Sequence, residues 1–144
     1  MEIRQIHPSE REKAVSLIWK TFLEFEAPDY SAKGTETFRT FIFDRGIFER
    51  VEFFGAFEDD GLKGVIATRN KRSHICCFFV LAQCQGQGMG KALWNYVKSD
   101  STAPVITVNA SPFAVPVYHK LGFSDTNTEQ LKDGIRYTPM QFIR

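Results

Sequence analysis

Little in this sequence indicates a charged partner or a membrane. The 18 lysines and arginines nearly balance the 17 aspartates and glutamates, which leaves a formal net charge of +1. Because nonspecific binding to nucleic acids and anionic lipids depends on an excess of basic residues, we expect neither nucleic acid nor a membrane as a partner. The first nine residues lack the apolar stretch of a signal peptide, and no segment reaches the ~20 apolar residues of a membrane span. The expected location is therefore cytoplasmic.

Cysteine is also scarce. The chain has three cysteines, of which Cys76 and Cys77 are adjacent and Cys84 stands alone. Disulfide-stabilised domains use an even set of spaced cysteines, so a disulfide scaffold is excluded. The three histidines form no cluster with these cysteines at the spacing that zinc ligands need, and we therefore expect no metal.

The sequence contains no linker, internal repeat or low-complexity run. Its 144 residues are 43% hydrophobic and 24% charged, which is near the average for a folded domain and leaves room for one core. We expect residues 1–144 to form a single domain. Phenylalanine is unusually abundant, with 14 residues, and this abundance indicates either a core packed with phenylalanine or a roomy apolar pocket.

Apolar residues at intervals of three and four predict two helices in the first third of the chain. The first should begin at Ser9 and Glu12, which have the S-x-x-E spacing of a capping box, and end near Glu26. A loop over residues 29–34 and a shorter helix that ends before Gly46 should follow.

Two further helices are expected in the second half. One opens at the glycine-rich segment 86–90 and has its apolar residues on one face. The other begins at Ser111 and Pro112, since the first turn of a helix does not use the N–H that proline lacks. Pro116 should bend or delay this helix, and Gly122 should end it.

Short runs rich in β-branched and aromatic residues predict the strands. They span 2–6, 51–57, 62–68, 74–81, 105–109, a short stretch from 123 onward, and 135–143. Asp59, Asp60 and Gly61 indicate a hairpin turn. The run 74–81 is apolar on both faces, as in a central strand covered by helices, whereas Pro139 marks the last strand as an edge or bulged strand. The order β-α-α-β-β-β-α-β-α-β-β predicts a mixed α/β fold with helices on both faces of one sheet.

The most informative segment is FFVLAQCQGQGMGK, residues 78–91, in which a buried strand passes through a glycine-rich loop into a helix. The first N–H groups of a helix lack internal partners, and glycines let a phosphate approach them, so a diphosphate is the natural ligand. The spacing G-x-G-x-G over 86–90 does not match the dinucleotide pattern. Ala92 follows Lys91 where the ATP-binding P-loop needs a hydroxyl, so neither NAD nor ATP is favoured.

The loop instead fits the pattern Q-x-x-G-x-G, with Gln85, Gly88 and Gly90 in the three specified places. A second segment, VNASPFAVPVYHKLGF at 108–123, has a strand-end Asn, a helix with Tyr and a closing L-G-F. In both motifs, and in the order of its elements, the chain resembles the GNAT superfamily of acetyl-CoA-dependent N-acetyltransferases. The resemblance implies a mixed, mostly antiparallel central sheet whose fourth and fifth strands splay apart.

The resemblance further implies a site for acetyl-CoA as cosubstrate, with no metal. The residues that would wrap its diphosphate are Gln85, Gly86, Gln87, Gly88, Gly90 and Lys91. The backbone of Phe79 and Val80 would pair with the pantetheine arm as an added strand, and Asn109 would hydrogen-bond the arm from the other side. Tyr118 matches the tyrosine near the thioester sulfur, and is the expected catalytic residue because a phenol of pKa about 10 can give a proton to a departing thiolate.

We therefore predict an enzyme that transfers an acetyl group to a primary amine, on a small molecule or peptide, by direct attack. The general base is open: the superfamily often uses a Glu on the fourth strand, where this sequence has His74, Cys76 and Cys77. His74 fits either a base that titrates near neutrality or a strand-end residue, and the cysteines fit small buried residues better than nucleophiles. The missing base, and Pro116 close to Tyr118, leave an alternative: a catalytically silent acyl-CoA-binding regulatory module.

Three features outside the motifs remain open. The loop after the first helix contains Phe25, Glu26, Asp29 and Tyr30. These residues form either an acidic and aromatic rim for a cationic amine or a solvated connection. The basic turn at 69–72 either meets the 3′-phosphate of CoA or is solvated. If the chain forms a homodimer, the edge strand near Pro139 is the contact that we expect.

Overall fold

The computed structural model describes residues 1–59 and 61–144. Asp60, a member of the predicted hairpin turn, lies outside the described residues. The strands are β1 (Glu2–Gln5), β2 (Glu52–Glu58), β3 (Gly61–Arg69), β4 (His74–Val80), β5 (Val105–Ala110), β6 (Ser124–Asp125), β7 (Gln130–Lys132) and β8 (Ile135–Ile143). The helices are α1 (Arg11–Phe25), α2 (Ala32–Ile42), α3 (Ile47–Arg50), α4 (Met89–Asp100) and α5 (Val115–Lys120). Apart from the short elements α3 and β7, this order is the predicted one.

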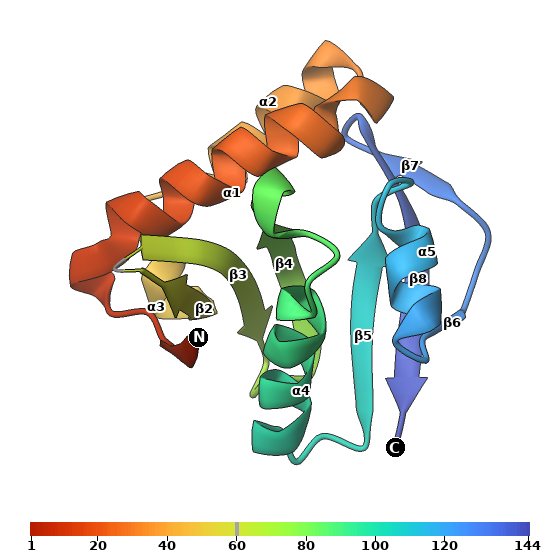
Figure 1. The fold of residues 1–144 in the computed structure, drawn as a ribbon. Coiled ribbons are helices and arrows are strands. Elements are labelled where there is room, and N and C mark those ends of the chain that lie inside the picture. Colours follow the sequence, from red (N-terminus) through yellow and green to blue (C-terminus); the bar gives the residue numbers. More distant parts are fainter. Residues whose placement is uncertain (60) are drawn as a thin grey trace.

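The sheet has the strand order β1-β2-β3-β4-β5-β8-β6, and β7 pairs with the beginning of β8. Neighbouring strands are antiparallel except β4 and β5, which are parallel. The prediction that the strand at 74–81 is central is confirmed, since β4 lies in the middle of this order. Figure 1 shows α1 and α2 lying together across one side of the sheet, with α4 and α5 on the other.

Two clusters of buried side chains hold these layers together. One lies between the sheet and α1 and α2, and the other between the sheet and α4 and α5. Phe53 and Phe54 are neighbours on β2 and belong to different clusters, because successive side chains of a strand point to opposite faces. Each of these two side chains is 1% exposed. Much of the phenylalanine therefore packs the core, on both faces of the sheet.

The middle of the sheet opens into a gap, as predicted. β4 and β5 pair at His74 with Thr107 and at Ile75 with Val108, and then diverge. Beside this point the register between β3 and β4 shifts, which leaves Cys76 as an extra residue on β4, and a bulge of this kind bends a strand. The divergence is visible in Figure 1, where the upper parts of β4 and β5 stand apart.

The start of α1 differs from the predicted capping box of Ser9 and Glu12. The carboxylate of Glu10 accepts a hydrogen bond from the backbone N–H of His7, at 3.1 Å. The same carboxylate receives two hydrogen bonds from Arg4, at 2.9 and 2.8 Å. The bidentate pair between Arg4 of β1 and Glu10 places Glu10 at the helix start. The spacing of residues in the sequence does not predict this contact.

The predicted loop at 29–34 is also shorter than expected. Ser31 accepts a hydrogen bond from the N–H of Gly34 at 3.2 Å, and α2 begins at Ala32. Serine is a favoured N-cap residue because its hydroxyl satisfies an N–H of the first turn. Gly34, which the sequence placed in the loop, lies in the first turn of α2.

The assignment of Pro139 to an edge strand is wrong. β8 lies between β5 and β6, and Pro139 pairs with Asn109 of β5. The carbonyl of Pro139 accepts a hydrogen bond from Thr126, just beyond the end of β6. The N–H and C=O of a residue point to the same side of a strand. The N–H that proline lacks would therefore face Thr126, beyond the end of β6, where no strand needs it as a partner. A homodimer through an edge at Pro139 therefore has no structural basis.

Pro116 delays α5, as predicted, and leaves the rest of the helix intact. It occupies the first turn of α5, where a proline costs no hydrogen bond. Gly122, with φ of 100°, ends the helix, and its N–H bonds the carbonyl of His119 at 3.1 Å. The N–H of Phe123 bonds the carbonyl of Tyr118 at 3.0 Å. These two bonds form a Schellman motif that fixes the turn of helix from which Tyr118 projects.

Candidate functional site

A glycine-rich turn joins β4 to α4 at one end of the gap. Gly86 and Gly88 adopt φ of 77° and 84°, a left-handed conformation that favours glycine. A Cβ built on either residue would meet no atom within 4 Å. Within the described chain, no acceptor is recorded for the backbone N–H groups of Gly88, Met89 and Gly90. An open surface of unpaired N–H groups at a helix N-terminus is suited to a phosphate.

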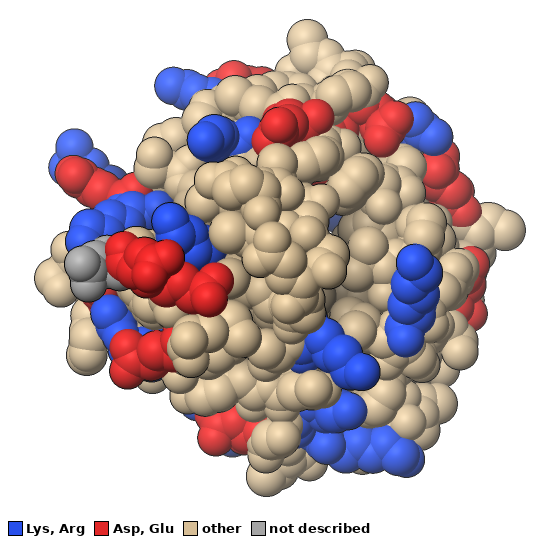
Figure 2. Space-filling view, in the orientation of Figure 1, with Lys and Arg blue, Asp and Glu red and all other residues tan. Residues whose placement is uncertain are grey.

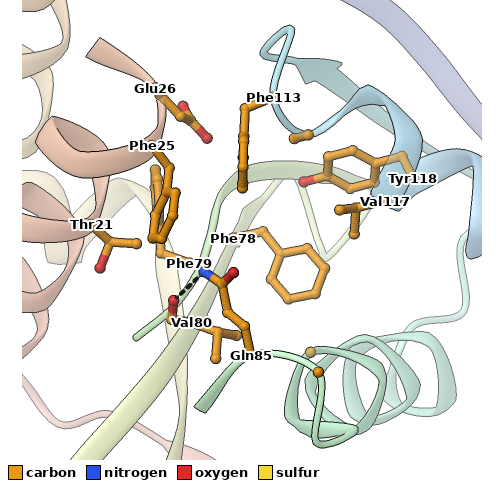
Figure 3. Close-up of a pocket in the computed structure, with 13 residues that line it drawn as sticks. Thr21, Phe25, Glu26, Phe78, Phe79, Val80, Gln85, Phe113, Val117 and Tyr118 are labelled. Atoms are coloured by element: carbon orange, nitrogen blue, oxygen red, sulfur yellow. Dashed lines mark hydrogen bonds between the residues drawn. The ribbon is translucent and has the colours of Figure 1, made fainter. Parts of the chain in front are cut away.

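A cavity of about 240 Å³ extends from this turn into the gap. Its lining consists of Thr21, Phe25, Glu26, Phe78, Phe79, Val80, Gln85, Gly86, Gly90, Phe113, Ala114, Val117 and Tyr118. Figure 3 shows Gln85 at the turn on one side and the hydroxyl of Tyr118 pointing inward on the other. We call this space the first cavity.

The backbone of β4 presents different residues to the gap than the resemblance implied. The N–H of Leu81 bonds the carbonyl of Lys63 on β3, and hydrogen-bonding direction alternates along a strand. With the register of β3 and β4, the backbone of Phe79 is therefore paired with β3. The backbone of Phe78 and Val80 is directed into the gap. The side-chain amide of Gln85 already bonds the carbonyl of Val80, at 3.0 Å (Figure 3).

A second cavity, of about 310 Å³, lies beyond the first. Its lining consists of Glu26, Tyr30, Thr37, Phe38, Phe41, Cys76, Cys77, Phe78, Phe79, Val108, Asn109, Ala110, Ser111, Ala114, Tyr118 and Ile135. The two cavities share Glu26, Phe78, Phe79, Ala114 and Tyr118. The two cavities therefore adjoin at Glu26 and Tyr118, with the glycine-rich turn beside the first and the aromatic side chains of α2 beside the second.

Tyr118 is the more deeply buried of the two polar residues at this junction, with 4% of its surface exposed. Burial raises the pKa of its phenol well above the usual value, and the nearby carboxyl of Glu26 raises it further. The ring lies against Phe78 and Phe123, with centroid distances of 6.0 and 5.2 Å. The phenol thus stays protonated at neutral pH and is held in one orientation.

Glu26 follows the last residue of α1 and lines both cavities. Burial raises the pKa of its carboxyl to about 7, and the nearby charge of Asp29 raises it too, against the opposing effect of a hydrogen bond with the side chain of Ser111. Figure 3 shows this carboxylate directed into the cleft, near Phe113. A carboxyl that is half ionised near neutral pH can accept a proton and later release it.

The candidate bases on β4 lie elsewhere or stay protonated. His74 is at the other end of β4, where its Nδ1 lies 2.8 Å from the hydroxyl of Thr107, roughly 20 Å from Val80 at ~3.3 Å per residue. Burial, together with Arg69, lowers the pKa of His74 to about 4. Burial raises the pKa of Cys76 to about 11, so its thiol is protonated at neutral pH.

The basic turn at 69–72 is also at the wrong end of the molecule for the 3′-phosphate of CoA. Arg72 makes ion pairs with Glu52 at 3.1 Å and with Asp100, the last residue of α4, at 3.4 Å. The glycine-rich turn is at the first residue of α4, and 12 residues of helix span about 18 Å. Arg72 therefore ties the hairpin to α4, while Arg69 and Lys71 are exposed to solvent.

The other predicted site residues lie around the same cleft. Asn109 lines the second cavity from β5. Gln87, Gly88 and Lys91 are exposed on the glycine-rich turn and the first turn of α4. Figure 2 shows lysine and arginine side chains gathered over α4, α5 and the C-terminal end of the chain, beside a hollow bordered by uncharged residues.

Sequence reasoning missed the central place of Glu26 and the contribution of Phe113. One signal for Glu26 was available: a carboxylate at a helix C-terminus faces the negative end of the dipole and is unfavourable there. Phe113 stacks on Phe25 with a centroid distance of 5.0 Å. That contact joins the end of α1 to the loop before α5, and no local pattern predicts it.

Comparisons with known proteins agree with this geometry. A family model with the description Acetyltransferase (GNAT) domain matches residues 26–144. A GCN5-related N-acetyltransferase from Rhodopseudomonas palustris superposes with a TM-score of 0.85 at 18% identity, covering 99% of this chain and 95% of its own. The PaiA N-acetyltransferase from Thermoplasma acidophilum, in complex with coenzyme A, gives 0.77 at 17% identity, with 99% and 98% covered.

A third structure, apo YjaB from Escherichia coli, gives a TM-score of 0.73 at 23% identity and covers 97% of this chain and 94% of its own. At these identities the likeness establishes the fold. No curated protein matches the sequence. Over residues 1–59 and 61–144, no helix is long and apolar enough to cross a membrane, and no group of three metal-ligating side chains is present.

Proposed function

Since the chain belongs to the GNAT family of acetyltransferases, we propose that it transfers the acetyl group of acetyl-CoA to a primary amine by direct attack. The observation that supports this proposal most is the pair of adjoining cavities, because Glu26 and Tyr118 belong to the lining of both. With the cosubstrate in one cavity and the acceptor in the other, the reacting groups would meet beside these two side chains.

In this proposal the diphosphate of CoA lies on the glycine-rich turn, and the pantetheine arm occupies the first cavity. The unpaired N–H groups of Gly88, Met89 and Gly90 bind phosphate oxygens, and Lys91 adds a positive charge at the same turn. The arm pairs with the backbone of Phe78 and Val80, and Asn109 approaches it from β5. The coenzyme A bound by the Thermoplasma relative supports this arrangement by analogy.

The reaction forms the N–C bond and breaks the C–S bond, and the substrate nitrogen loses two protons, one from the ammonium before the attack and one after it. One proton ends on the CoA thiolate and the other passes through Glu26 to solvent. The lone pair of the amine nitrogen attacks the thioester carbonyl carbon, the new N–C bond forms, the C–S bond breaks, and CoA leaves as a thiolate. The N–H of Val80, which is directed into the gap, is the proposed donor to the oxyanion.

Glu26 is the proposed general base. An alkylammonium has a pKa near that of lysine, about 10, so the bound amine must lose a proton before or during the attack. With its pKa of about 7, Glu26 is ionised in a large part of the molecules at neutral pH and can take that proton, directly or through one water. No ionisable residue on β4 needs to perform this step.

Tyr118 is the proposed donor to the leaving sulfur. Because its pKa is raised, the phenol retains its proton until the C–S bond breaks. A free thiol has a pKa of about 8.5, below that of the phenol, so Tyr118 stabilises the thiolate mainly through a hydrogen bond. The proton that CoA finally takes can come from Tyr118 or from Glu26 through solvent.

The direct test combines binding with turnover. Calorimetry should detect acetyl-CoA binding to the wild-type protein, and binding should be lost in Gly88→Glu, whose side chain fills the phosphate surface. A thiol-detecting assay with a broad panel of amines should then show amine-dependent CoA release. Binding without any turnover would favour the silent acyl-CoA-binding module, and absence of binding would overturn both functions.

A further inference from the structure

The second cavity indicates the class of acceptor, and this inference rests on the proposed function. We infer that the acceptor carries a single primary amine on an apolar, aromatic body, which lies among the side chains of α2 and β4 with its amine at Glu26. The volume of about 310 Å³ is at the lower end of the range of about 300–1,000 Å³ for small-molecule pockets.

The lining supplies apolar contact on several sides. Phe38 and Phe41 come from α2, and Phe78 and Phe79 come from β4. Phe38 stacks on Phe22 at a centroid distance of 4.1 Å and lies 6.0 Å from Phe41. These rings are already held by the core before a ligand enters, and a rigid aromatic wall favours an apolar or aromatic body through burial and ring stacking.

The charge in this cavity fits one cation. Glu26 is the single Asp or Glu among the described lining residues, which also include no Lys or Arg. The other ionisable groups that line it are Tyr30, Cys76, Cys77 and Tyr118, and the pKa of each is raised above its usual value. They are neutral at neutral pH. A polyamine or an aminoglycoside would bring several ammonium groups into a space with one carboxylate, and each unpaired charge would be costly to desolvate.

An apolar pocket also assists the chemistry. Desolvation lowers the pKa of an amine, because burial disfavours the charged form. An ammonium that enters this cavity therefore moves toward the neutral, nucleophilic state, and the Glu26 carboxyl is the nearby acceptor for its proton. A solvated, highly charged pocket would not have this effect.

On one side of the cavity, α2 is held against the turn between β7 and β8. The hydroxyl of Thr37 on α2 donates a hydrogen bond to the carbonyl of Asp133 at 2.7 Å. The backbones of Gly34 and Gly134 are in direct contact, so a Cβ added to either residue would overlap the other. This contact joins α2 to the turn between β7 and β8, beside the lining residue Ile135. The part of α2 that lines the cavity is therefore held in place before an acceptor binds.

The test compares 2-phenylethylamine, an aromatic monoamine, with 1,4-diaminobutane, kanamycin and a lysine-containing peptide under one assay of CoA release. We expect kcat/KM for 2-phenylethylamine to exceed that of each of the others by more than about tenfold. A faster reaction with diaminobutane, kanamycin or the peptide would overturn this inference and leave the transferase function standing. Absence of turnover with every amine would contradict the transferase function itself.

A matched pair of variants locates the effect. Phe41 lines the cavity and is half-buried. Phe43 is on the same helix end, is 46% exposed and lies against Trp19 outside the cavity. Phe41→Ala should raise KM for 2-phenylethylamine roughly tenfold without changing KM for acetyl-CoA, and Phe43→Ala should change neither. Equal effects of the two variants would overturn the assignment of this cavity to the acceptor.

Discussion

Glu26 is held in a state that costs the folded protein stability. It caps the C-terminal end of α1, lies in a largely apolar cleft and has Asp29 nearby. Its folded-state pKa of about 7 is above the value of 4.5 expected for an unfolded chain. The folded protein therefore binds this proton more tightly, and the stability that depends on Glu26 decreases as the pH rises from about 4.5 to 7. A destabilising group of this kind is typical of functional sites.

We predict that Glu26→Gln lowers kcat by about 10² to 10⁴ and changes its pH profile. In the wild type, log kcat at saturating amine should rise as the pH passes through about 7, because the carboxyl must be ionised to accept a proton. The variant should show no inflection there. As a control for folding, Glu26→Gln should be more stable than the wild type above pH 7 in urea unfolding. A wild-type pH profile retained in the variant would remove Glu26 from the mechanism.

Tyr118→Phe should lower kcat far more than it lowers the affinity for acetyl-CoA. The substitution removes one hydroxyl and keeps the ring that packs against Phe78 and Phe123, so the fold and the cosubstrate contacts are preserved. A loss of kcat with an unchanged dissociation constant indicates an interaction made in the transition state. Equal losses in both, measured by calorimetry and initial rates, would mean that the hydroxyl binds the cosubstrate and does not act on the leaving group.

Two substitutions at Gly88 distinguish the effect of backbone strain from the effect of filling the space above the glycine-rich turn. Gly88 is in the left-handed region, with φ of 84°, and a Cβ there would meet nothing within 4 Å. Ala at this position costs roughly 1 kcal/mol of backbone strain, whereas Asn tolerates the conformation better. If the open space is the phosphate site, both Gly88→Ala and Gly88→Asn should weaken acetyl-CoA binding in calorimetry. Recovery of wild-type affinity in the Asn variant would attribute the effect to strain alone.

Gly34 on α2 gives a test of how this helix is held against the turn between β7 and β8. A glycine inside a helix is normally improved by alanine, by about 1 kcal/mol. Here we expect the opposite sign, because the added Cβ would overlap the backbone carbonyl of Gly134. Gly34→Ala should lower the free energy of unfolding by at least about 2 kcal/mol. Gly46→Ala is the matched control, since its Cβ would meet first the end of the flexible Arg50 side chain. A stabilised Gly34→Ala would show that the helix end moves freely.

The elements that were predictable are those set by local sequence. Turn residues, apolar periodicity and the glycines at 86–90 predicted most of the strands and helices and the turn before α4, since each depends on a few neighbouring residues. The capping box of Ser9 and Glu12 was wrong because the start of the helix depends on the pairing of Glu10 with Arg4. The edge position of Pro139 was wrong because it depends on where β6 ends. Strand order in the sheet is set by contacts between distant segments, which local patterns do not contain.

Across the whole molecule, the site exists because distant segments meet at the gap in the sheet. Glu26 and Ser111 are 85 positions apart in the sequence, and both line the second cavity. The divergence of β4 and β5 opens the path between them, and α1, α2 and α5 supply its walls. The family resemblance predicted the splay and the glycine-rich turn. It did not indicate Glu26, the proposed base, because this residue lies at the end of α1 and not on the expected strand. That residues 1–144 form a single domain stays a prediction.

The central claim is that an amine in the cleft attacks bound acetyl-CoA directly. Rapid-quench single turnover, with enzyme in excess over acetyl-CoA and 2-phenylethylamine added, tests it most directly. We predict the N-acetylated amine and free CoA in equal amounts at the same rate, with no acetylated protein in intact mass spectra before the amine is added, and a much slower reaction in Tyr118→Phe. An acetyl group on the protein before amine addition, or bound acetyl-CoA that yields no amide with any amine, would contradict the account.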